Sequence, residues 1–378
     1  MASPYIFPLG KTQINLVLPS AYAYICELKF IYLRNINFVE MKPSCMCRLS
    51  ASLLLSVVLV SVCAPTVCAE TYTNPVINHN APDPTVIRAK DGTYWLYSTE
   101  SIPNLPIYKS DNLVDWDFVG TAFTDETRPQ MVPGGKIWAP DIQWVGKKYV
   151  LYYSKSQWGK EWECGIGVAT ADAPEGPFTD HGKLFLSNEI GVQNSIDPIY
   201  VEAEGKHWLF WCSFRGIYAI ELSSDGLSVK SGAEPVMVAG TFTEATNIFR
   251  HRGYYYLVGS AGSCCEGEKS TYRVVVARSK KVIGPYVDKN GVPAIENGFS
   301  LLLEGDDTVK GPGHNANFVK DDAGQYWMLY HGYDASAPQE GRKVYLDRVE
   351  WDADGWPSVG EGKPSKSAEM PIIKGRGK

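Results

Sequence analysis

The stretch "RGYYYLVGS", residues 252–260, sets three tyrosines in a row before a short apolar run. Four other stretches share its pattern of turn residues, an alternating aromatic and aliphatic segment, and a final Ser, Thr or Gly. They are "DGTYWLYST" (91–99), "GKKYVLYYS" (146–154), "GKHWLFWCS" (205–213) and "GQYWMLYHG" (324–332). Runs of aromatic and aliphatic residues bounded by turn residues are typical of β-strands. We interpret the five stretches as five copies of one structural unit.

The spacing of these copies predicts the fold. Their matched aromatic residues recur at broadly similar intervals, and a β-branched run ending in a turn follows each copy. No long segment beyond residue 69 has the period of a helix. One antiparallel unit per roughly 60 residues predicts an all-β, five-bladed β-propeller. Two stacked β-sandwiches are the alternative, but they give no reason for five matching units. The matched residues are Tyr94, Tyr149, Trp208, Tyr255 and Trp327.

A strongly polar residue precedes the matched aromatic residue of each copy by a similar distance. In a propeller the innermost strand of every blade lines the central channel. Residues at matching positions of the five inner strands should therefore meet in one pocket. The alternative is five unrelated turn residues, since Asp-Pro and Asn-rich segments are common in turns. The five polar residues are Asp83, Asp141, Asp197, Glu244 and His314.

Several carboxylates in one pocket indicate acid–base chemistry. Their mutual repulsion raises the pKa of at least one of them, which leaves one carboxylic acid beside one carboxylate. Glycoside hydrolysis uses such a pair. The chain lacks the G-x-S-x-G motif of serine hydrolases and the glycine-rich loops that bind phosphates. A net charge of −6 and a pI near 5.6 argue against a nucleic acid partner.

Several longer motifs together resemble glycoside hydrolase family 43. They are "APDPTVIR", "WAPDI", "NSIDP", "EATNIF", "GSCCEGEKSTYRVVVARSKKVIGPYVDKNG", "GPGHNANF" and "EWDADGWP", and the resemblance spans residues 73–359. Within that family the chain looks most like the arabinan endo-1,5-α-L-arabinosidases. The resemblance implies a five-bladed propeller enzyme that acts on a plant cell-wall polysaccharide, either arabinan or arabinoxylan.

The resemblance also implies roles for three carboxylates. Asp83 corresponds to the general base that activates water, and Glu244 to the general acid that protonates the leaving oxygen. Asp197 corresponds to a third carboxylate that adjusts the pKa of the acid. The implied mechanism is inverting, for which the base and acid carboxyl groups should lie roughly 6.5 to 9.5 Å apart.

Further binding residues are expected around these carboxylates. His314 corresponds to a residue near a hydrated cation, usually Ca²⁺, whose remaining ligands would be waters. Trp138 forms either a wall of the sugar subsite or part of the core. A loop with Ser263 and the two adjacent cysteines is expected near the pocket, with Arg273 beneath it. The candidate substrate-binding residues are Trp138, Asp141, Asn194, Ser195 and Arg273.

Two departures from the family pattern leave the mode of cleavage open. The acid motif reads "EATN", so Asn247 changes the wall beside the acid, and a Trp-rich loop occupies residues 154–165. Endo cleavage needs an open cleft and exo cleavage a blocked one, and this loop could close one end. The alternatives are therefore an exo-acting α-L-arabinofuranosidase, a β-xylosidase of the same family, or a non-catalytic carbohydrate-binding propeller.

The segment over 1–69 differs in character from the rest of the chain. Met41 offers a second start, followed by Lys42, Arg48 and the apolar run "LLLSVVLVSV" (53–62), which is typical of a secretory signal. We expect an upstream extension over 1–40, a signal peptide over 41–69 and one catalytic propeller over 70–378. A membrane anchor or a lipoprotein is the alternative. The mature chain is expected to be monomeric, without a membrane span, and periplasmic or secreted.

Four cysteines remain beyond residue 69, at positions 164, 212, 264 and 265. Their scatter is not that of a disulfide framework, and no pair has zinc-binding spacing. We expect buried thiols. The adjacent Cys264 and Cys265 could instead form a disulfide after export.

Overall fold

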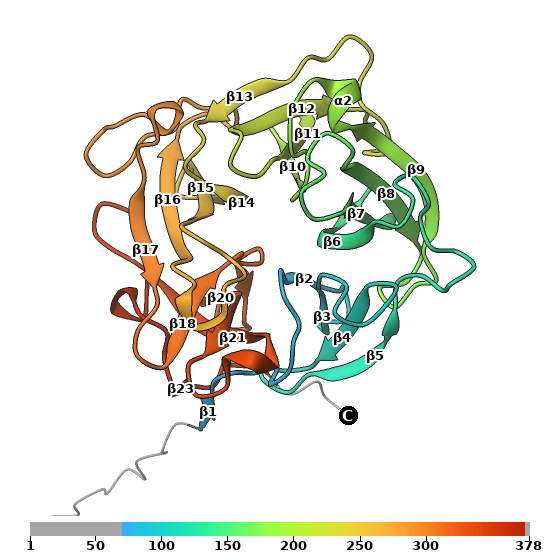
Figure 1. Cartoon of the computed structure of the whole chain (residues 1–378). Helices are drawn as coiled ribbons and strands as arrows, with labels where there is room; N and C mark the ends of the chain where they lie inside the picture. Colours follow the sequence, from blue (N-terminus) through green and yellow to red (C-terminus); the bar gives the residue numbers. More distant parts are fainter. Residues whose placement is uncertain (1–69, 375–378) are drawn as a thin grey trace, which may run out of the picture. The chain divides into compact units, whose positions relative to one another are not determined.

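The five repeated stretches form the second strands of five antiparallel sheets in the computed structural model, which describes residues 70–374. Figure 1 shows these sheets, or blades, around a common centre. This arrangement confirms the predicted five-bladed β-propeller. Blade 1 contains β2 (Thr85–Arg88), β3 (Tyr94–Tyr97), β4 (Pro106–Ser110) and β5 (Asp117–Thr121); blade 2 contains β6 (Lys136–Val145), β7 (Lys148–Ser156), β8 (Gly165–Ala171) and β9 (Thr179–Leu186); blade 3 contains β10 (Ile199–Ala203), β11 (Lys206–Trp211), β12 (Ile217–Leu222) and β13 (Val236–Ala239). Blade 4 contains β14 (Glu244–His251), β15 (Tyr254–Ala261), β16 (Arg273–Ser279) and β17 (Ser300–Glu304); blade 5 contains β18 (Val309–Gly313), β19 (Val319–Lys320), β20 (Tyr326–Asp334), β21 (Arg342–Trp351) and β22 (Pro357–Val359).

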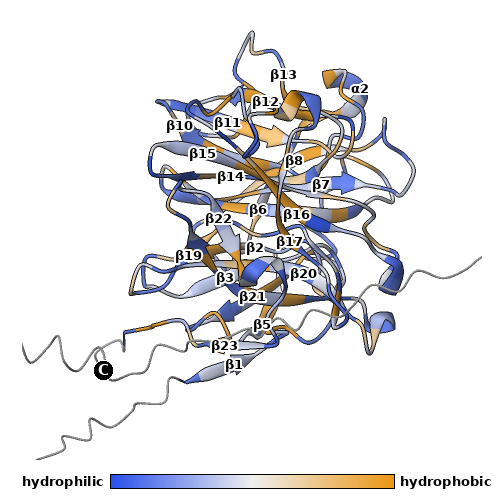
Figure 2. Cartoon of the chain, turned by 90° about the vertical axis from the view of Figure 1, so that its left-hand side faces the viewer, coloured by the Kyte–Doolittle hydropathy of each residue, from blue (hydrophilic) through white to orange (hydrophobic). Residues whose placement is uncertain are grey.

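Strand alternation explains the three tyrosines of the repeated stretch. Successive side chains of a strand point to opposite faces of its sheet. In β15, Tyr255 and Leu257 pack into a cluster shared with blade 3, whereas Tyr256 and Val258 pack into a cluster shared with blade 5. Each second strand is thus buried on both faces. Figure 2 shows hydrophobic residues concentrated along the strands and hydrophilic residues in the loops.

Five hydrophobic clusters lie between neighbouring blades, so the core is a ring of interfaces rather than one centre. The two ends of the described chain close this ring. β1 (Thr71–Thr73) pairs with β23 (Ser367–Glu369), with Tyr72 opposite Ala368. Beside this pair, the Val76 N–H donates to the Val344 carbonyl oxygen at 2.9 Å. The segment that leads into blade 1 is therefore joined to blade 5 by backbone hydrogen bonds, and blades 1 and 5 share an apolar cluster.

The helices of the described residues are short. The longest, α2 (Ser187–Ile190), has four residues and begins directly after β9. No helix between residues 70 and 374 is long and apolar enough to cross a membrane. The other helices are single 3₁₀ turns: η1 (Gly267–Lys269), η2 (Ala294–Glu296), η3 (Pro338–Glu340) and η4 (Gly360–Gly362).

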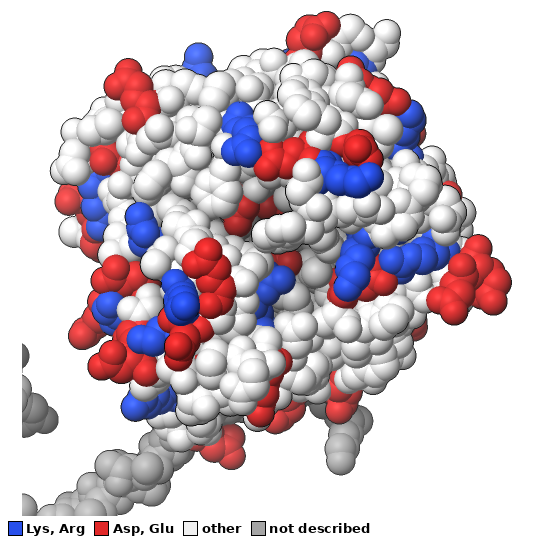
Figure 3. Space-filling model, viewed as in Figure 1, with Lys and Arg blue, Asp and Glu red and all other residues white. Residues whose placement is uncertain are grey.

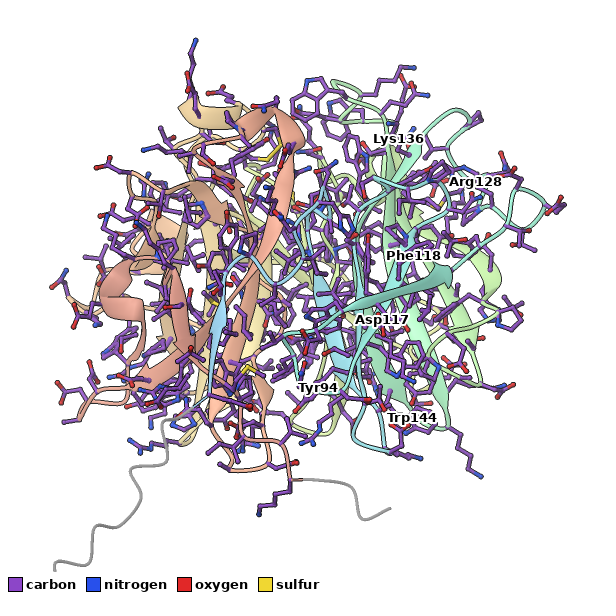
Figure 4. The ribbon with its side chains drawn as sticks, turned by 90° about the horizontal axis from the view of Figure 1, so that it is seen from below. Tyr94, Asp117, Phe118, Arg128, Lys136 and Trp144 are labelled. Carbon is purple, nitrogen blue, oxygen red and sulfur yellow. A yellow bond between two sulfur atoms is a disulfide. The ribbon has the colours of Figure 1, made fainter. Side chains whose placement is uncertain are left out.

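The inner strands run between the two faces of the ring. Figure 4 places Lys136, at the start of β6, near one face and Trp144, near the end of β6, toward the other. The expected extension over 1–40 and signal peptide over 41–69 lie outside the described residues.

Candidate active site

A cavity of about 950 Å³ is lined by residues from all five blades, including Lys136 at the start of β6. We call it the central pocket. Figure 3 shows a hollow at the centre of this face, where acidic and basic side chains meet. Most of the side chains predicted from the sequence reach it. They are Asp83, Trp138, Asn194, Asp197, Glu244, Ser263, Cys264, Cys265 and His314.

A left-handed residue near the pocket end of every inner strand turns the chain toward the pocket. These five residues are Asp83, Ala139, Asp197, Ala245 and His314, and their φ angles lie between 39° and 59°. None of them is glycine, and this conformation costs other residues on the order of 1 kcal/mol. Register shifts accompany the turn in blades 2, 4 and 5, as expected for β-bulges. The inner strands therefore share a feature that aims side chains at one place.

A belt of hydrogen bonds between successive blades holds four of these turns. In each case the backbone N–H of the left-handed residue donates to a side chain near the end of the preceding blade's second strand. The belt consists of Ala139 to Thr99 Oγ1 at 2.7 Å, Asp197 to Ser154 Oγ at 2.8 Å, His314 to Ser260 Oγ at 2.8 Å and Asp83 to His331 Nδ1 at 3.1 Å. Blade 4 differs, because the Ala245 N–H bonds to Asp197. Ser213, the residue of blade 3 that matches the belt, instead donates to Glu244 Oε2.

The Asp83 carboxylate is buried and closely surrounded by donors. Its Oδ1 accepts a hydrogen bond from Arg342 Nη1 at 2.7 Å and lies 3.3 Å from His314 Nδ1. Its Oδ2 accepts from Thr99 Oγ1 at 2.6 Å. Burial opposes ionisation, but the Arg342 guanidinium and then His314 outweigh it and hold the pKa of Asp83 well below its usual range. Asp83 is therefore ionised at neutral pH.

His331 is neutral beside Asp83. Burial and the nearby Arg342 lower the pKa of His331 to about 4. Its Nδ1 lies 3.1 Å from both the backbone nitrogen and Oδ1 of Asp83. An unprotonated Nδ1 can accept only from the N–H, so the charge that compensates the carboxylate comes from Arg342.

The surroundings of Glu244 shift its pKa in the opposite direction. Its Oε1 accepts a hydrogen bond from the Tyr272 hydroxyl at 2.7 Å, and its Oε2 is bonded to Ser213. Burial and the negative charge of Asp83 raise the pKa of Glu244, although its two hydroxyl partners lower it. A serine hydroxyl can donate or accept, so it serves both the ionised and the protonated carboxyl group.

Asp197 shares the buried region with Glu244. Burial, repulsion by Glu244 and repulsion by Asp83 raise the pKa of Asp197 well above its usual range. Two buried carboxyl groups that repel each other titrate as a pair and hold one proton between them more tightly than an isolated carboxyl group would. The pocket thus combines one carboxylate whose pKa is lowered with a pair of carboxyl groups whose pKa values are raised.

Asp141 does not line the central pocket, which corrects the expectation that it binds substrate. It is buried, and its Oδ2 accepts the Tyr200 N–H at 2.8 Å while its Oδ1 accepts from Gln143 Nε2 at 2.9 Å. Burial raises the pKa of Asp141 to about 7. It lines a smaller cavity of about 20 Å³ that shares Asp197 and His314 with the central pocket. The carboxylate therefore ties blade 2 to blade 3.

Ser195 and Arg273 also lie away from the central pocket. Ser195 is fully buried, where its Oγ donates to the Val192 carbonyl and accepts from Trp211 Nε1. The Arg273 guanidinium lies 5.7 Å from the Phe242 ring centre. Both were expected to contact or underlie the substrate, and the structure corrects both. Ser195 bonds to residues of blade 3 and its approach. Arg273 points away from the pocket because side chains alternate along an extended chain and its neighbour Tyr272 points into the pocket.

The cysteines divide into two groups. Cys164 and Cys212 are free, buried thiols, as predicted. Cys264 and Cys265 are joined by a disulfide, so the expectation of thiols is wrong for this pair. Both line the central pocket, on the loop between β15 and β16.

The model of "Glycosyl hydrolases family 43" matches residues 72–357 of the sequence. The chain belongs to glycosyl hydrolase family 43. The predicted resemblance, which spanned 73–359, is confirmed.

Curated relatives of the chain carry names of arabinan-cleaving enzymes. An extracellular exo-α-(1→5)-L-arabinofuranosidase of Cellvibrio japonicus is 34% identical over 74% of this chain and 86% of the relative. An extracellular endo-α-(1→5)-L-arabinanase of Bacillus subtilis is 32% identical over 73% of this chain and 86% of the relative. An arabinan endo-1,5-α-L-arabinosidase of Emericella nidulans is 35% identical over 72% of this chain and 89% of the relative.

Solved structures of arabinanases have the same fold. An α-L-arabinanase of Cellvibrio cellulosa in complex with arabinohexaose superposes with a TM-score of 0.68 at 31% identity, covering 75% of this chain and 96% of that one. A family 43 endo-arabinanase of Bacillus licheniformis superposes with a TM-score of 0.65 at 30% identity, covering 74% of this chain and 98% of that one.

Five residues that contact the Asp83 or Glu244 carboxyl groups were not predicted from the sequence: Thr99, Ser213, Tyr272, His331 and Arg342. Thr99 and Ser213 are the final residues of their repeated stretches, so the repeat itself contained this signal. Tyr272 precedes Arg273. Because side chains alternate along a strand, only one of these two can point into the pocket, and it is Tyr272. Arg342 had no comparable signal, because it lies 259 residues from Asp83 and outside every repeated stretch.

Proposed function

We propose that this chain is an inverting glycoside hydrolase that cleaves α-1,5-L-arabinofuranosyl linkages in arabinan. The observation that carries the proposal is the opposite state of the carboxyl groups in one pocket. Asp83 is stabilised as a carboxylate by Arg342, whereas Glu244 and Asp197 repel each other and keep a proton. An enzyme that protonates a leaving group and deprotonates a water needs both states at one pH.

Each group then has a role that its contacts support. Asp83 accepts a proton from the attacking water, with Thr99 and Arg342 fixing its two oxygens. Glu244 donates its proton to the glycosidic oxygen while that bond breaks, with Tyr272 and Ser213 fixing its carboxyl group. Asp197 shares that proton, and when the proton lies on Glu244 the Asp197 carboxylate is the negative neighbour that keeps it there. The remaining pocket-lining candidates, Trp138 and Asn194, contact the sugar.

Incubation with linear arabinan tests the activity. A ladder of oligosaccharides supports endo cleavage, which the names of the Bacillus and Emericella relatives favour. Release of arabinose alone supports the exo mode of the Cellvibrio japonicus relative. An intact polymer with cleaved xylobiose indicates a xylosidase, and no turnover of either indicates a binding propeller. Proton NMR of the first product distinguishes inversion from retention at the anomeric carbon.

The pH dependence tests the role of Asp197. Activity requires ionised Asp83 and protonated Glu244, so kcat/KM should fall as pH drops through the low pKa of Asp83 and as pH rises through the raised pKa of the pair. The Asp197→Asn variant removes the repulsion, so Glu244 ionises more readily. We expect the alkaline limb to move down by about one pH unit. The control is Asp307→Asn, whose carboxylate is fully exposed. An unchanged alkaline limb would contradict the role.

A hydrated cation, Ca²⁺, is proposed beside His314. No cluster of three or more His, Cys, Asp or Glu side chains suited to a metal was found among residues 70–374, so a cage of protein ligands is not supported. However, the small cavity is lined by Asn247 and Asn315, whose buried amide oxygens have no partner among the described residues. Oxygen atoms and waters are what Ca²⁺ prefers. With waters, His314 and the two amide oxygens would hold it, and its charge would favour ionised carboxylates nearby.

Calcium is therefore expected to stabilise the protein. At a concentration 100 times the dissociation constant, binding to the folded state adds about 2.7 kcal/mol to the free energy of unfolding, which raises Tm by several degrees. Thermal unfolding in Ca²⁺ and in EDTA measures the shift. The Asn315→Leu variant should lose the shift, and an Asn290→Leu control on the surface should keep it. Equal Tm values in Ca²⁺ and EDTA would remove the cation from the proposal.

We also propose that the chain is exported and that its mature form is a monomer beginning near residue 70. The two relatives named extracellular support export. Mass spectrometry of the protein from the medium or periplasm tests whether the segment over 1–69 is removed, and light scattering measures the oligomeric state.

A further inference from the structure

The Cys264–Cys265 disulfide lies against the arginine that holds Asp83. Cys264 Sγ is 3.7 Å from Arg342 Nη1, and the same Nη1 donates to Asp83 Oδ1 at 2.7 Å. Among residues 70–374, these two atoms are the hydrogen-bond partners of the Arg342 side chain. Sulfur accepts hydrogen bonds weakly, so the disulfide acts on Arg342 mainly by filling the space beside it. The place of the guanidinium therefore depends on where the sulfur atoms lie.

The backbone of Arg342 is fixed independently of the disulfide. Its N–H donates to Asn80 Oδ1 at 2.9 Å, and its carbonyl oxygen accepts from the Ala81 N–H at 2.9 Å. The side chain is different, because an arginine loses much rotamer freedom when it is held in one geometry. Loss of the disulfide is therefore expected to move the guanidinium and to leave β21 in place.

The loop that carries the disulfide also leads to a partner of the acid, but its base is held by other contacts. The Ser263 N–H donates to Thr271 Oγ1 at 3.0 Å, and the Thr271 N–H donates to the Ser263 carbonyl oxygen at 3.1 Å. Tyr272 follows directly and donates to Glu244. These bonds involve neither sulfur atom. Opening the disulfide should therefore disturb the partner of Asp83 and spare the partner of Glu244.

An external reductant can reach this disulfide. Cys265 is exposed, Cys264 is half-buried, and both line the central pocket, whereas the two free thiols are buried. Accessible disulfides are the ones that thiolates attack readily. In that reaction the S–S bond breaks, the two cysteines gain two electrons and two protons to become thiols, and a dithiol is oxidised to a cyclic disulfide. The two free side chains can then rotate independently.

We propose that the Cys264–Cys265 disulfide positions Arg342 for the reaction, and that its reduction by a dithiol slows turnover by releasing the guanidinium from Asp83. The inference rests on the proposed function, in which Asp83 is the base. Small displacements of groups near the reacting atoms lower rates substantially. The enzyme is then fully active only in an oxidising compartment, where disulfides persist.

Kinetics before and after reduction test the proposal. Dithiothreitol should lower kcat on linear arabinan about tenfold and change KM less than about twofold, and oxidised glutathione should restore kcat. The loss on an aryl arabinofuranoside should be equal, because the base is needed for both substrates. An unchanged kcat, a change in KM alone, or a larger loss on arabinan than on the aryl substrate would overturn the proposal.

Variants separate this disulfide from the other cysteines. The double variant Cys264→Ser with Cys265→Ser should have the lowered kcat without reductant and should not respond to it. The control Cys164→Ser keeps the disulfide and should respond as wild type does. If the double variant does not fold, reduction of wild type still decides, with thermal unfolding measured before and after to show that the fold is kept.

The position of Arg342 is also measured without activity. Its guanidinium N–H signals in heteronuclear NMR spectra, assigned by their absence from Arg342→Lys, should shift when the disulfide is reduced. Unchanged signals would overturn the positioning role. If oxidised wild type cleaves neither arabinan nor the aryl substrate, the proposed function fails, and these signals still decide whether the disulfide holds Arg342.

Discussion

The Glu244→Gln variant is expected to hydrolyse linear arabinan about a thousandfold more slowly than wild type. An amide has the shape of the carboxyl group but no acidic proton, so the sugar alkoxide must leave unprotonated. The hydrogen bond from Tyr272 can still be accepted by the amide oxygen, which preserves the local structure. Steady-state kinetics on arabinan measure kcat.

A second substrate separates loss of the acid from general damage. An aryl arabinofuranoside with a nitrophenol leaving group needs little protonation, so Glu244→Gln should retain much more of its activity on it. Glu268→Gln is the matched control, because Glu268 is exposed on η1 in the loop between β15 and β16. Equal losses on both substrates would remove Glu244 from the role of acid.

The Asp83→Asn variant is expected to lose about a thousandfold on both substrates. Water must lose its proton whatever the leaving group, and an amide cannot accept that proton. The amide oxygen can still accept a hydrogen bond from Arg342, so the pocket should keep its shape. Kinetics on arabinan and on the aryl substrate measure the loss.

An added anion distinguishes the base from a merely structural residue. Azide needs no deprotonation, so it should restore turnover of the aryl substrate by Asp83→Asn and give an arabinosyl azide of inverted configuration. Asp117→Asn, an exposed position on β5 of the same blade that Figure 4 labels, is the control. Activity of Asp83→Asn near wild type would exclude Asp83 as the base, and a product of retained configuration would exclude the inverting mechanism.

The sequence predicted those parts of the site that repeat. Asp83, Trp138, Asp197 and Glu244 all stand at the same distance before the matched aromatic of their blade, and all four line the central pocket. Asp141 stands closer in sequence to its matched aromatic, Tyr149, which places it farther along the inner strand and below the pocket. This shorter spacing was the signal that separates Asp141 from the others.

Features without a repeat could not be predicted in this way. The disulfide depends on the exposed path of one loop, and the place of Arg342 depends on how blade 5 meets blade 1. Ser195 and Arg273 were misplaced because the neighbours of a site residue point in other directions along an extended chain. Contacts between blades follow from packing and not from any local pattern.

Closure of the ring by β1 and β23 has a kinetic consequence. The pair joins residues 71–73 to residues 367–369, and the contact of Asp83 with Arg342 spans 259 residues. Contacts of such long range form late and slow the folding reaction. During synthesis the first four blades can stack as they leave the ribosome. Asp83 nevertheless lacks its partner Arg342 until the last strands of blade 5 have been made. Truncation just beyond Val359 should therefore yield a slowly maturing, protease-sensitive intermediate rather than a smaller enzyme.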